Sequence, residues 1–389
     1  MLSALVVATG LVLGACAAEA ATFTVESRSL PGLNPKAPMV IHSIRMTGRF
    51  EQGDADRLRK ELTRLRASTV PVSGTPLATA ELSSDGGDVY ESLNVGYLFK
   101  EFNVATVVRK GDLCLSACAL AFLGGTASHL PPTLVPNRAI EVGGQVGFHN
   151  FYLNPDSASL PAARDAATSL VTGFNLARGG SSLLISYAAA MAIDPGFVAR
   201  LLGRPSEEWE YIDVDGKFVD LASCPIGIER PSVNQQTVAV NICNHGTGWF
   251  SPAEPSQARR ITERQAKRDL LERVQRNIEV FALKGPLVGQ LAGVIASRDD
   301  RLVDAVYSDL RLAGIPLPDL VGPIFEVSGY VAGAYQMQCH VSFSLDDPDK
   351  YDLAIQGPAG LTRAFRSAPP NCRRLFLFHR NDMLNPQKR

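Results

Sequence analysis

One serine, one histidine and a glycine pair in this 389-residue chain are of the types that acyl-transfer chemistry requires. Ser116 is the middle residue of segment 114–118 (CLSAC), which follows a predicted strand and leads into an apolar run. A serine at such a turn exposes its hydroxyl, and a general base that removes its proton makes it a nucleophile. His149 ends another predicted strand, in segment 147–150 (GFHN), and is the candidate base.

Segment 84–88 (SDGGD) joins a predicted strand to a predicted helix. Its two glycines allow backbone angles with positive φ and leave amide N–H groups uncovered at a helix N-terminus. Uncovered N–H groups can stabilise the negative charge that develops on a carbonyl oxygen under attack. Gly87 and Ala117 are therefore the candidate oxyanion-hole residues.

The elements that must position these residues alternate between strands and helices. We expect strands at 38–46, 77–83, 104–108 and 142–149, and helices at 54–66 (capped by Asp54), 89–102 and within 160–192. This alternation predicts right-handed βαβ units and a mainly parallel α/β sheet. Sites in such sheets form at the carboxyl ends of strands, where both the Gly-Gly turn and the Ser116 turn fall. Asp215-Gly216 between two alternating runs predicts a hairpin over 209–221.

The order SxGG, a serine turn about thirty residues later and a histidine at a strand end resembles the proteolytic subunit of Clp protease. The wider clan includes signal peptide peptidase A and the crotonases. The C-x-S-A-C turn is similar to that of exported bacterial proteins of this fold. The resemblance covers about residues 38–225 and implies a ClpP/crotonase-like ββα spiral core, with Ser116 as nucleophile, His149 as base and Gly87 with Ala117 as oxyanion donors.

Two features depart from that family. The stretch from Ser116 to His149 is longer than the family needs, with an inserted loop expected near Leu130–Asn137. No third triad acid is evident, and the weak candidates are Asp194, Glu207, Glu208 and Glu210. Another acceptor can fix the histidine tautomer, but a missing acid can lower kcat by several powers of ten.

Six of the seven cysteines follow the N-terminal segment, an even number that suits disulfides in an oxidising compartment. Sequence neighbours suggest the pairs Cys114–Cys118, Cys224–Cys243 and Cys339–Cys372. A bridge around Ser116 fits only if the chain bends there, and it would then lock the serine turn; a redox-active pair is the alternative. The spacings do not suit zinc, and we expect no metal and no cofactor.

The N-terminus predicts export. Residues 2–15 are almost unbroken apolar, and 18–20 (AEA) fits signal-peptidase cleavage before Ala21. Residues 13–16 (LGAC) also fit a lipoprotein box, in which Cys16 would carry the lipid; either outcome predicts a periplasmic or otherwise exported protein. We expect a signal peptide at 1–21, a ClpP/crotonase-like domain at 22–245, and a C-terminal region at 250–389, helical with small β elements, whose function is unknown.

The charge balance bounds the partners. The formal net charge is −1, which gives no reason to expect nucleic acid as a partner, and only the N-terminus offers a membrane anchor.

Three functions remain open. The first is a serine hydrolase that cleaves peptides or proteins through an acyl-enzyme, and the second is a peptide-binding or scaffold protein of the same fold. The third is a crotonase-like thioester enzyme, which export disfavours because coenzyme A is cytoplasmic. The family implies a homo-oligomer. The other five histidines are expected to be structural.

Overall fold

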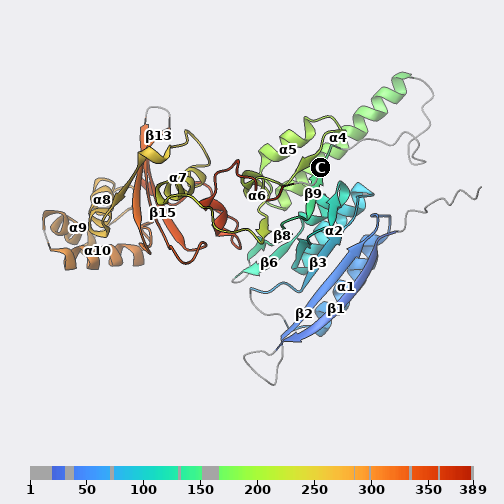
Figure 1. The fold of residues 1–389 in the computed structure, drawn as a ribbon, viewed down its shortest axis with the longest axis horizontal. Helices are drawn as coiled ribbons and strands as arrows, with labels where there is room; N and C mark the ends of the chain where they lie inside the picture. Colours follow the sequence, from blue (N-terminus) through green and yellow to red (C-terminus); the bar gives the residue numbers. More distant parts are fainter. Residues whose placement is uncertain are drawn as a thin grey trace, which may run out of the picture.

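The computed structural model describes residues 20–30, 39–70, 74–129, 133–150, 166–283, 285–297, 299–332, 335–357 and 360–386. The expected signal peptide, including Cys16, lies outside these residues except for Ala20 and Ala21. The chain forms an N-terminal lobe, drawn in blue to green, and a C-terminal lobe, drawn in yellow to red (Figure 1).

A six-stranded sheet organises the N-terminal lobe, in the order β1-β2-β3-β4-β8-β11. The strands are β1 (Thr22–Leu30), β2 (Met39–Thr47), β3 (Ala78–Ser83), β4 (Val104–Val108), β8 (Arg138–Glu141) and β11 (Cys224–Ile226). Neighbours from β2 to β11 pair in parallel. Strand β1, which is not predicted from the sequence, pairs antiparallel with β2. The prediction of a mixed α/β fold with parallel strands is confirmed.

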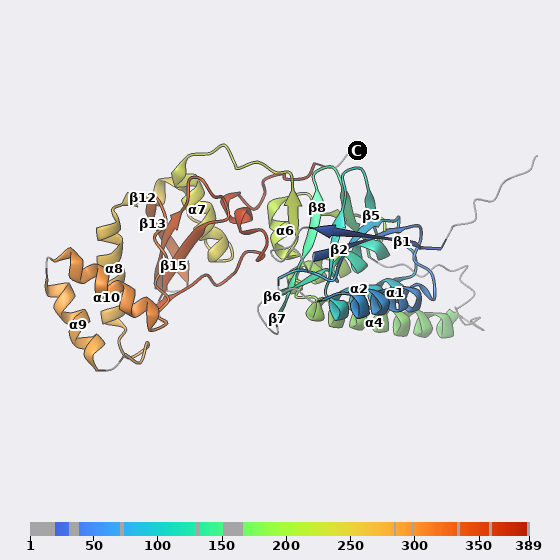
Figure 2. The same ribbon diagram turned by 90° about the horizontal axis from the view of Figure 1, so that it is seen from below.

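A smaller sheet lies beside it, in the order β10-β9-β5. Its strands are β5 (Leu113–Leu115), β9 (Gln145–Phe148) and β10 (Glu210–Tyr211), and a separate hairpin pairs β6 (Thr126–His129) with β7 (Thr133–Pro136). The helices of this lobe are α1 (Asp54–Ser68), α2 (Val89–Phe102), α3 (Ala117–Phe122), α4 (Ala166–Ala190), α5 (Pro195–Leu202) and α6 (Asp215–Asp220). Figure 2 shows α1, α2 and α4 side by side in a layer along the sheet.

The two faces of the large sheet differ because residues alternate along each strand. On β3, the buried side chains are Ala78, Ala80 and Leu82, and they join the core formed with α1 and α2. The opposite face is ionic. Arg109 binds Glu81 at 2.6 Å and Glu141 at 2.8 Å on this face, so ion pairs tie β3, β4 and β8 together.

Arg138 is the largest fully buried side chain of the lobe. Its guanidinium donates to the main-chain oxygens of Leu221, at 2.6 Å, and Met191, at 2.5 Å. These carbonyls follow the C-terminal ends of α6 and α4, where carbonyl groups lack helical partners. Burial lowers the pKa of Arg138 to about 10, so the group remains a cation at neutral pH. Arg138 therefore fastens both helix ends to the sheet.

The C-terminal lobe is an antiparallel sheet, in the order β12-β13-β14-β15-β16, with helices packed on it. Its elements are α7 (Gln235–Gly246), η1 (Pro255–Gln257), β12 (Ala258–Ile261), α8 (Glu263–Arg276), α9 (Pro286–Ala296), α10 (Asp300–Leu312), β13 (Ile324–Ala332), β14 (Tyr335–Phe343), β15 (Tyr351–Gly357), β16 (Gly360–Thr362) and η2 (Arg373–Leu377). Helix α7 packs on this sheet, although the sequence predicts that the first domain extends to residue 245.

The three disulfides correct the predicted pairing. Cys114–Cys118 is formed, but the other two bonds join Cys224 to Cys372 and Cys243 to Cys339, so the pairs Cys224–Cys243 and Cys339–Cys372 were wrong. Both bonds close long loops, of 148 and 96 residues, because the C-terminal segment returns to the first lobe and α7 lies against β14. Sequence proximity carries no information on such contacts.

Three local predictions also differ from the structure. The 209–221 hairpin is wrong: β10 precedes α6, whose first amides, at Asp215 and Gly216, donate to Asp382 O and Arg380 O of the C-terminal segment. The described part of the expected loop over 130–137 is not irregular but forms strand β7. Gly53, not Asp54, is the N-cap of α1, and the Asp54 carboxylate instead accepts from the amide of Glu51.

Candidate active site

Ser116 lies between β5 and α3 in a conformation that few residues adopt. Its φ of 54° and ψ of −120° lie outside the favoured regions for a residue with a side chain. Such a backbone costs on the order of 1–3 kcal/mol and persists only where the surroundings enforce it. The amide of Ser116 donates to Gly147 O at 2.9 Å, so the turn is attached directly to β9. The sharp strand-to-helix turn directs the hydroxyl away from the core.

The Cys114–Cys118 disulfide spans this turn. The two Cα atoms are 5.1 Å apart, and both side chains are fully buried. One cysteine belongs to β5 and the other to α3, so the bond ties the strand to the helix on either side of Ser116. A covalent link here enforces the bend that the serine conformation needs.

The glycine turn 84–88 packs directly against the serine turn. Ser84 forms a parallel bridge with Cys114, and Leu115 N donates to Ser84 O at 3.0 Å. Gly86 and Gly87 have φ values of 121° and 137°. A Cβ on Gly86 would lie 2.9 Å from the Ser116 Cβ, and a Cβ on Gly87 would lie 2.3 Å from Phe50 O. Only glycine allows this close approach.

Two amides are available at this junction. Ala117 is the first residue of α3, so its N–H has no acceptor within the helix. Phe50 bonds on either side of Gly87, accepting from Asp88 N and donating to Gly86 O, and no acceptor for the Gly87 N–H is found in the described part of the chain. Both residues line the same pocket as Ser116. The structure thus brings the two expected oxyanion donors to the expected serine.

His149 follows β9 and approaches Ser116 from the other side. Its Nε2 lies 2.7 Å from Ser116 Oγ, a hydrogen-bonding distance for a nucleophile and its base. Strands β5 and β9 pair in parallel, with Leu115 opposite Gly147, so the two residues that follow these strands, Ser116 and His149, emerge at the same edge. Parallel pairing therefore explains why a serine and a histidine 33 residues apart meet.

A pocket of about 470 Å³ opens over this pair. Apolar side chains form one wall, and a charged pair, Arg49 and Asp85 at 3.2 Å, stands at its rim. The apolar lining residues are Val89, Leu120, Phe148, Leu201 and Trp209. A pocket with an apolar wall beside a Ser–His pair can accept an acyl group or side chain next to the reacting carbonyl.

All four candidate third acids have partners of their own. Glu207 accepts from Ser206 Oγ at 3.3 Å. Asp194 caps α5 by accepting from the amides of Gly196 and Phe197, and Glu208 lies 3.8 Å from Arg204. Glu210 is buried and binds Arg204 at 2.6 Å. Glu210 pairs with Phe148 across β10 and β9, so its side chain leaves the sheet on the face opposite to His149.

Two residues of the site were not predicted from the sequence. Trp209 places its ring 4.5 Å from that of His149, at an angle of 48°. Phe50 supports the glycine turn through two main-chain hydrogen bonds. The tryptophan could have been found from its position at the head of a short strand, but a main-chain support has no signal in residue type.

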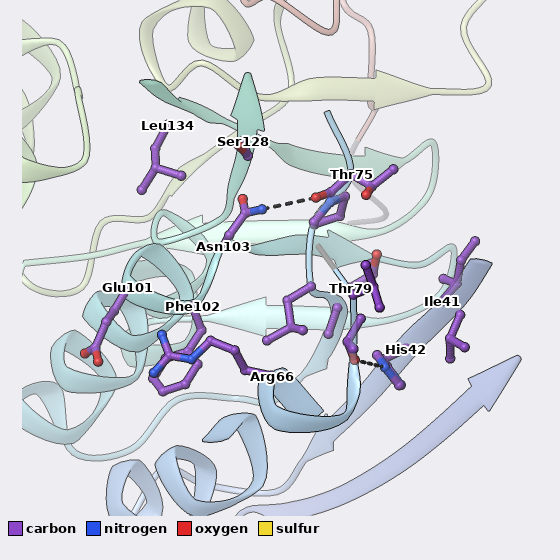
Figure 3. A pocket seen from close by; sticks show the side chains of 16 residues that line it. Ile41, His42, Arg66, Thr75, Thr79, Glu101, Phe102, Asn103, Ser128 and Leu134 are labelled. Carbon is purple, nitrogen blue, oxygen red and sulfur yellow. Dashed lines mark hydrogen bonds between the residues drawn. The ribbon is translucent and has the colours of Figure 1, made fainter. Parts of the chain in front are cut away.

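A larger pocket of about 540 Å³ lies at the opposite end of the parallel strands (Figure 3). Its polar groups bind one another: His42 Nε2 contacts Thr69 Oγ1 at 2.8 Å, and the Asn103 side-chain amide donates to Thr75 O. The Arg66 guanidinium lies over the Phe102 ring. His42 also contacts Ser27 Oγ at 2.8 Å, but Ser27 lies within β1, not at a turn before a helix. This second serine–histidine contact thus lacks the elbow seen at Ser116.

Within the described segments no group of His, Cys, Asp and Glu side chains could hold a metal ion. Among the same residues no helix is long and apolar enough to cross a membrane. The three disulfides are compatible with an exported protein, because such bonds persist in oxidising compartments.

Comparisons with known proteins identify no family. No family model matches the chain, and no curated protein matches it. Among solved structures, one match is a mutant of the 1510-N membrane-bound stomatin-specific protease, with a TM-score of 0.29 and 12% identity, covering 44% of this chain and 70% of that one.

Proposed function

We propose that this protein is a serine hydrolase that acts through an acyl-enzyme on Ser116, with His149 as general base. The observation that carries the proposal is the 2.7 Å contact between Ser116 Oγ and His149 Nε2 on a turn with positive φ. Further support comes from the pocket, which the serine and the histidine share with the N-terminus of a helix and with the glycine turn. A serine that merely caps a helix needs neither a base nor this conformation.

The proposed reaction begins with the attack of Ser116 Oγ on a substrate carbonyl carbon. His149 Nε2 takes the hydroxyl proton as the new C–O bond forms. The carbonyl oxygen becomes an oxyanion that accepts hydrogen bonds from the N–H groups of Gly87 and Ala117. Collapse of this intermediate breaks the bond to the leaving group, and the imidazolium returns its proton to that group.

Water completes the cycle. His149 removes a proton from a water molecule, the resulting hydroxide attacks the acyl carbon, and the acyl–Oγ bond breaks with return of the proton to Ser116. Every proton moves through one imidazole nitrogen, so the reaction needs no metal or cofactor. Removal of one oxyanion donor costs roughly 10²–10³ in kcat in enzymes of this kind.

Peptides are the substrates we propose, and the ClpP/crotonase-like spiral core is the fold. The order of the glycine turn, the serine turn and the histidine supports both, since it is the order found in the Clp protease family. The three disulfides and the apolar N-terminal segment support an exported, periplasmic location, with Cys16 as an alternative lipid attachment site.

A fluorophosphonate probe tests the proposal, since it reacts only with activated serines. We expect labelling of a single site, Ser116, identified by mass spectrometry, and loss of labelling in Ser116→Ala and His149→Ala. Ser27→Ala is the matched control, because Ser27 also contacts a histidine but lacks the elbow, and it should label like the wild type. A folded wild-type chain that does not react would refute the hydrolase and leave peptide capture, measured with Ser116→Ala, as the function of the pocket.

A further inference from the structure

The Trp209 indole packs against the base of the candidate dyad. Strand β10 pairs antiparallel with β9, with Glu210 opposite Phe148 and Tyr211 opposite Gly147. The next step of this register sets Trp209 opposite His149. Their ring centroids are 4.5 Å apart and their planes meet at 48°. Since side chains alternate along a strand, Trp209 and Tyr211 share the face toward which His149 points.

The Tyr211 ring packs on the Trp209 ring and supports its contact with His149. The Trp209 and Tyr211 rings are nearly parallel, with centroids 6.0 Å apart and an angle of 20°. The Tyr211 ring in turn packs against Gly147, where a Cβ would be 2.7 Å from the Tyr211 Cε1. Gly147 O also accepts the hydrogen bond from Ser116 N. The same glycine thus anchors both the serine turn and the aromatic stack.

Strand β10 has two residues, and buried charges hold it in place. Glu210 is 4% exposed and lies 2.6 Å from an Arg204 nitrogen and 3.5 Å from Lys217 Nζ. Lys217 also donates to Tyr211 O at 2.8 Å, and Ile212 N donates to Val146 O at 3.0 Å. Breaking a buried ion pair is costly, so this strand is fixed relative to β9. The Trp209 ring therefore has a rigid support.

We propose that Trp209 is a positioning residue for His149, an inference that rests on the proposed hydrolase function. The indole restricts rotation of the imidazole, so that Nε2 stays directed at Ser116 Oγ. Its face also stabilises the positive charge that the imidazole carries once it has taken the serine proton, through a cation–π interaction. Trp209 does not touch the reacting atoms; it acts through the base.

Three substitutions separate this role from simple packing. Trp209→Leu keeps an apolar side chain but removes the ring face, whereas Trp209→Phe keeps a ring. With a fluorophosphonate probe, we expect the maximal inactivation rate of Trp209→Leu to fall by about tenfold to a hundredfold, while the probe's half-saturation concentration changes little. Trp209→Phe should stay within about threefold of the wild type. Trp249→Leu is the control, since Trp249 also packs against histidine rings but in the other lobe, and its rate should not change.

The outcomes are distinguishable. A wild type that does not label refutes the hydrolase itself. Normal labelling of the wild type and of Trp209→Leu overturns the positioning role alone. A higher half-saturation concentration with an unchanged maximal rate would show that Trp209 acts only as a wall of the pocket, and it would also overturn the positioning role. A second measurement needs no activity: in Trp249→Phe, Trp209 is the sole tryptophan, so His149→Ala should change its fluorescence, because an adjacent imidazole quenches indole. Unchanged emission would contradict the contact.

Discussion

His340 in the C-terminal lobe should make the stability of this protein depend on pH. The residue lies on β14 between Glu326 of β13 and Ala354 of β15, and its side chain is fully buried. Among the residues that the structure describes, neither ring nitrogen has a hydrogen-bond partner. Burial lowers the pKa of His340 from 6.5 to about 4, with a smaller effect of the same sign from the Arg273 guanidinium and an opposing one from Glu326.

The direction in which pH changes the free energy of unfolding follows from comparing the folded and unfolded chains. Below pH 6.5 the unfolded chain binds a proton at this histidine, whereas the folded chain does so only near pH 4. The free energy of unfolding therefore falls as the pH drops from 6.5 to 4, and it stops falling below that range. For this one group the loss between pH 7 and pH 5 amounts to about 2 kcal/mol.

His340→Leu removes this dependence. It should stabilise the protein at pH 7 by about 1–3 kcal/mol, because it replaces a buried polar ring that finds no hydrogen-bond partner in the described part of the chain. The gap between variant and wild type should then widen by about 2 kcal/mol at pH 5, or roughly 4–8 °C in the melting temperature of a lobe of this size. Thermal melts followed by circular dichroism at pH 7, 6 and 5 measure it. His379→Leu, at an exposed histidine, is the control; a constant gap across these pH values for His340→Leu would refute the reasoning.

Three further predictions concern the N-terminal lobe. Arg138→Met should lower the free energy of unfolding by about 2–4 kcal/mol, because two buried carbonyls lose their donor. A urea titration measures this free energy, and a change below ~0.5 kcal/mol would contradict the role of Arg138 in fastening the helix ends to the sheet. Gly87→Ala should abolish fluorophosphonate labelling, since a Cβ would be 2.3 Å from Phe50 O, and retention of the wild-type rate would contradict the assigned position of this amide. The double variant Cys114→Ala, Cys118→Ala should react with the fluorophosphonate at least tenfold more slowly at unchanged secondary structure, because the bend at the serine is no longer enforced. An equal rate would show that the disulfide is dispensable for the serine turn.

The local pattern was enough to predict much of the parallel sheet. Helix α2 and strand β4 have the predicted bounds, 89–102 and 104–108, because each carries a period that matches its own structure and is bounded by turn residues. Because sites in parallel sheets form at the carboxyl ends of strands, the sequence also predicts that the glycine turn and the serine turn lie at one edge. Their catalytic roles remain predictions, since no measurement of reactivity bears on them.

The predictions that were wrong concern residues whose structure depends on contacts between distant segments. Asp215-Gly216 resembles a hairpin turn, yet the C-terminal segment accepts hydrogen bonds from both amides, and helix α6 begins there. The sequence could not reveal this because the partner residues lie more than 160 positions away. Two of the disulfide pairings failed for the same reason: the correct partner is set by how the lobes pack, not by spacing.

The C-terminal segment also explains why the second lobe bears on the candidate site. Asn385 is buried against the turn that precedes β9: its Oδ1 accepts from Gly143 N and its Nδ2 donates to Gly144 O, both at 2.8 Å. Strand β9 starts at the next residue, Gln145, and His149 follows it. The Cys224–Cys372 disulfide ties the same returning segment to β11 of the large sheet. Because His149 can hold Ser116 only while β9 keeps its register with β5, the last residues of the chain stabilise the geometry of a site formed by residues more than two hundred positions earlier.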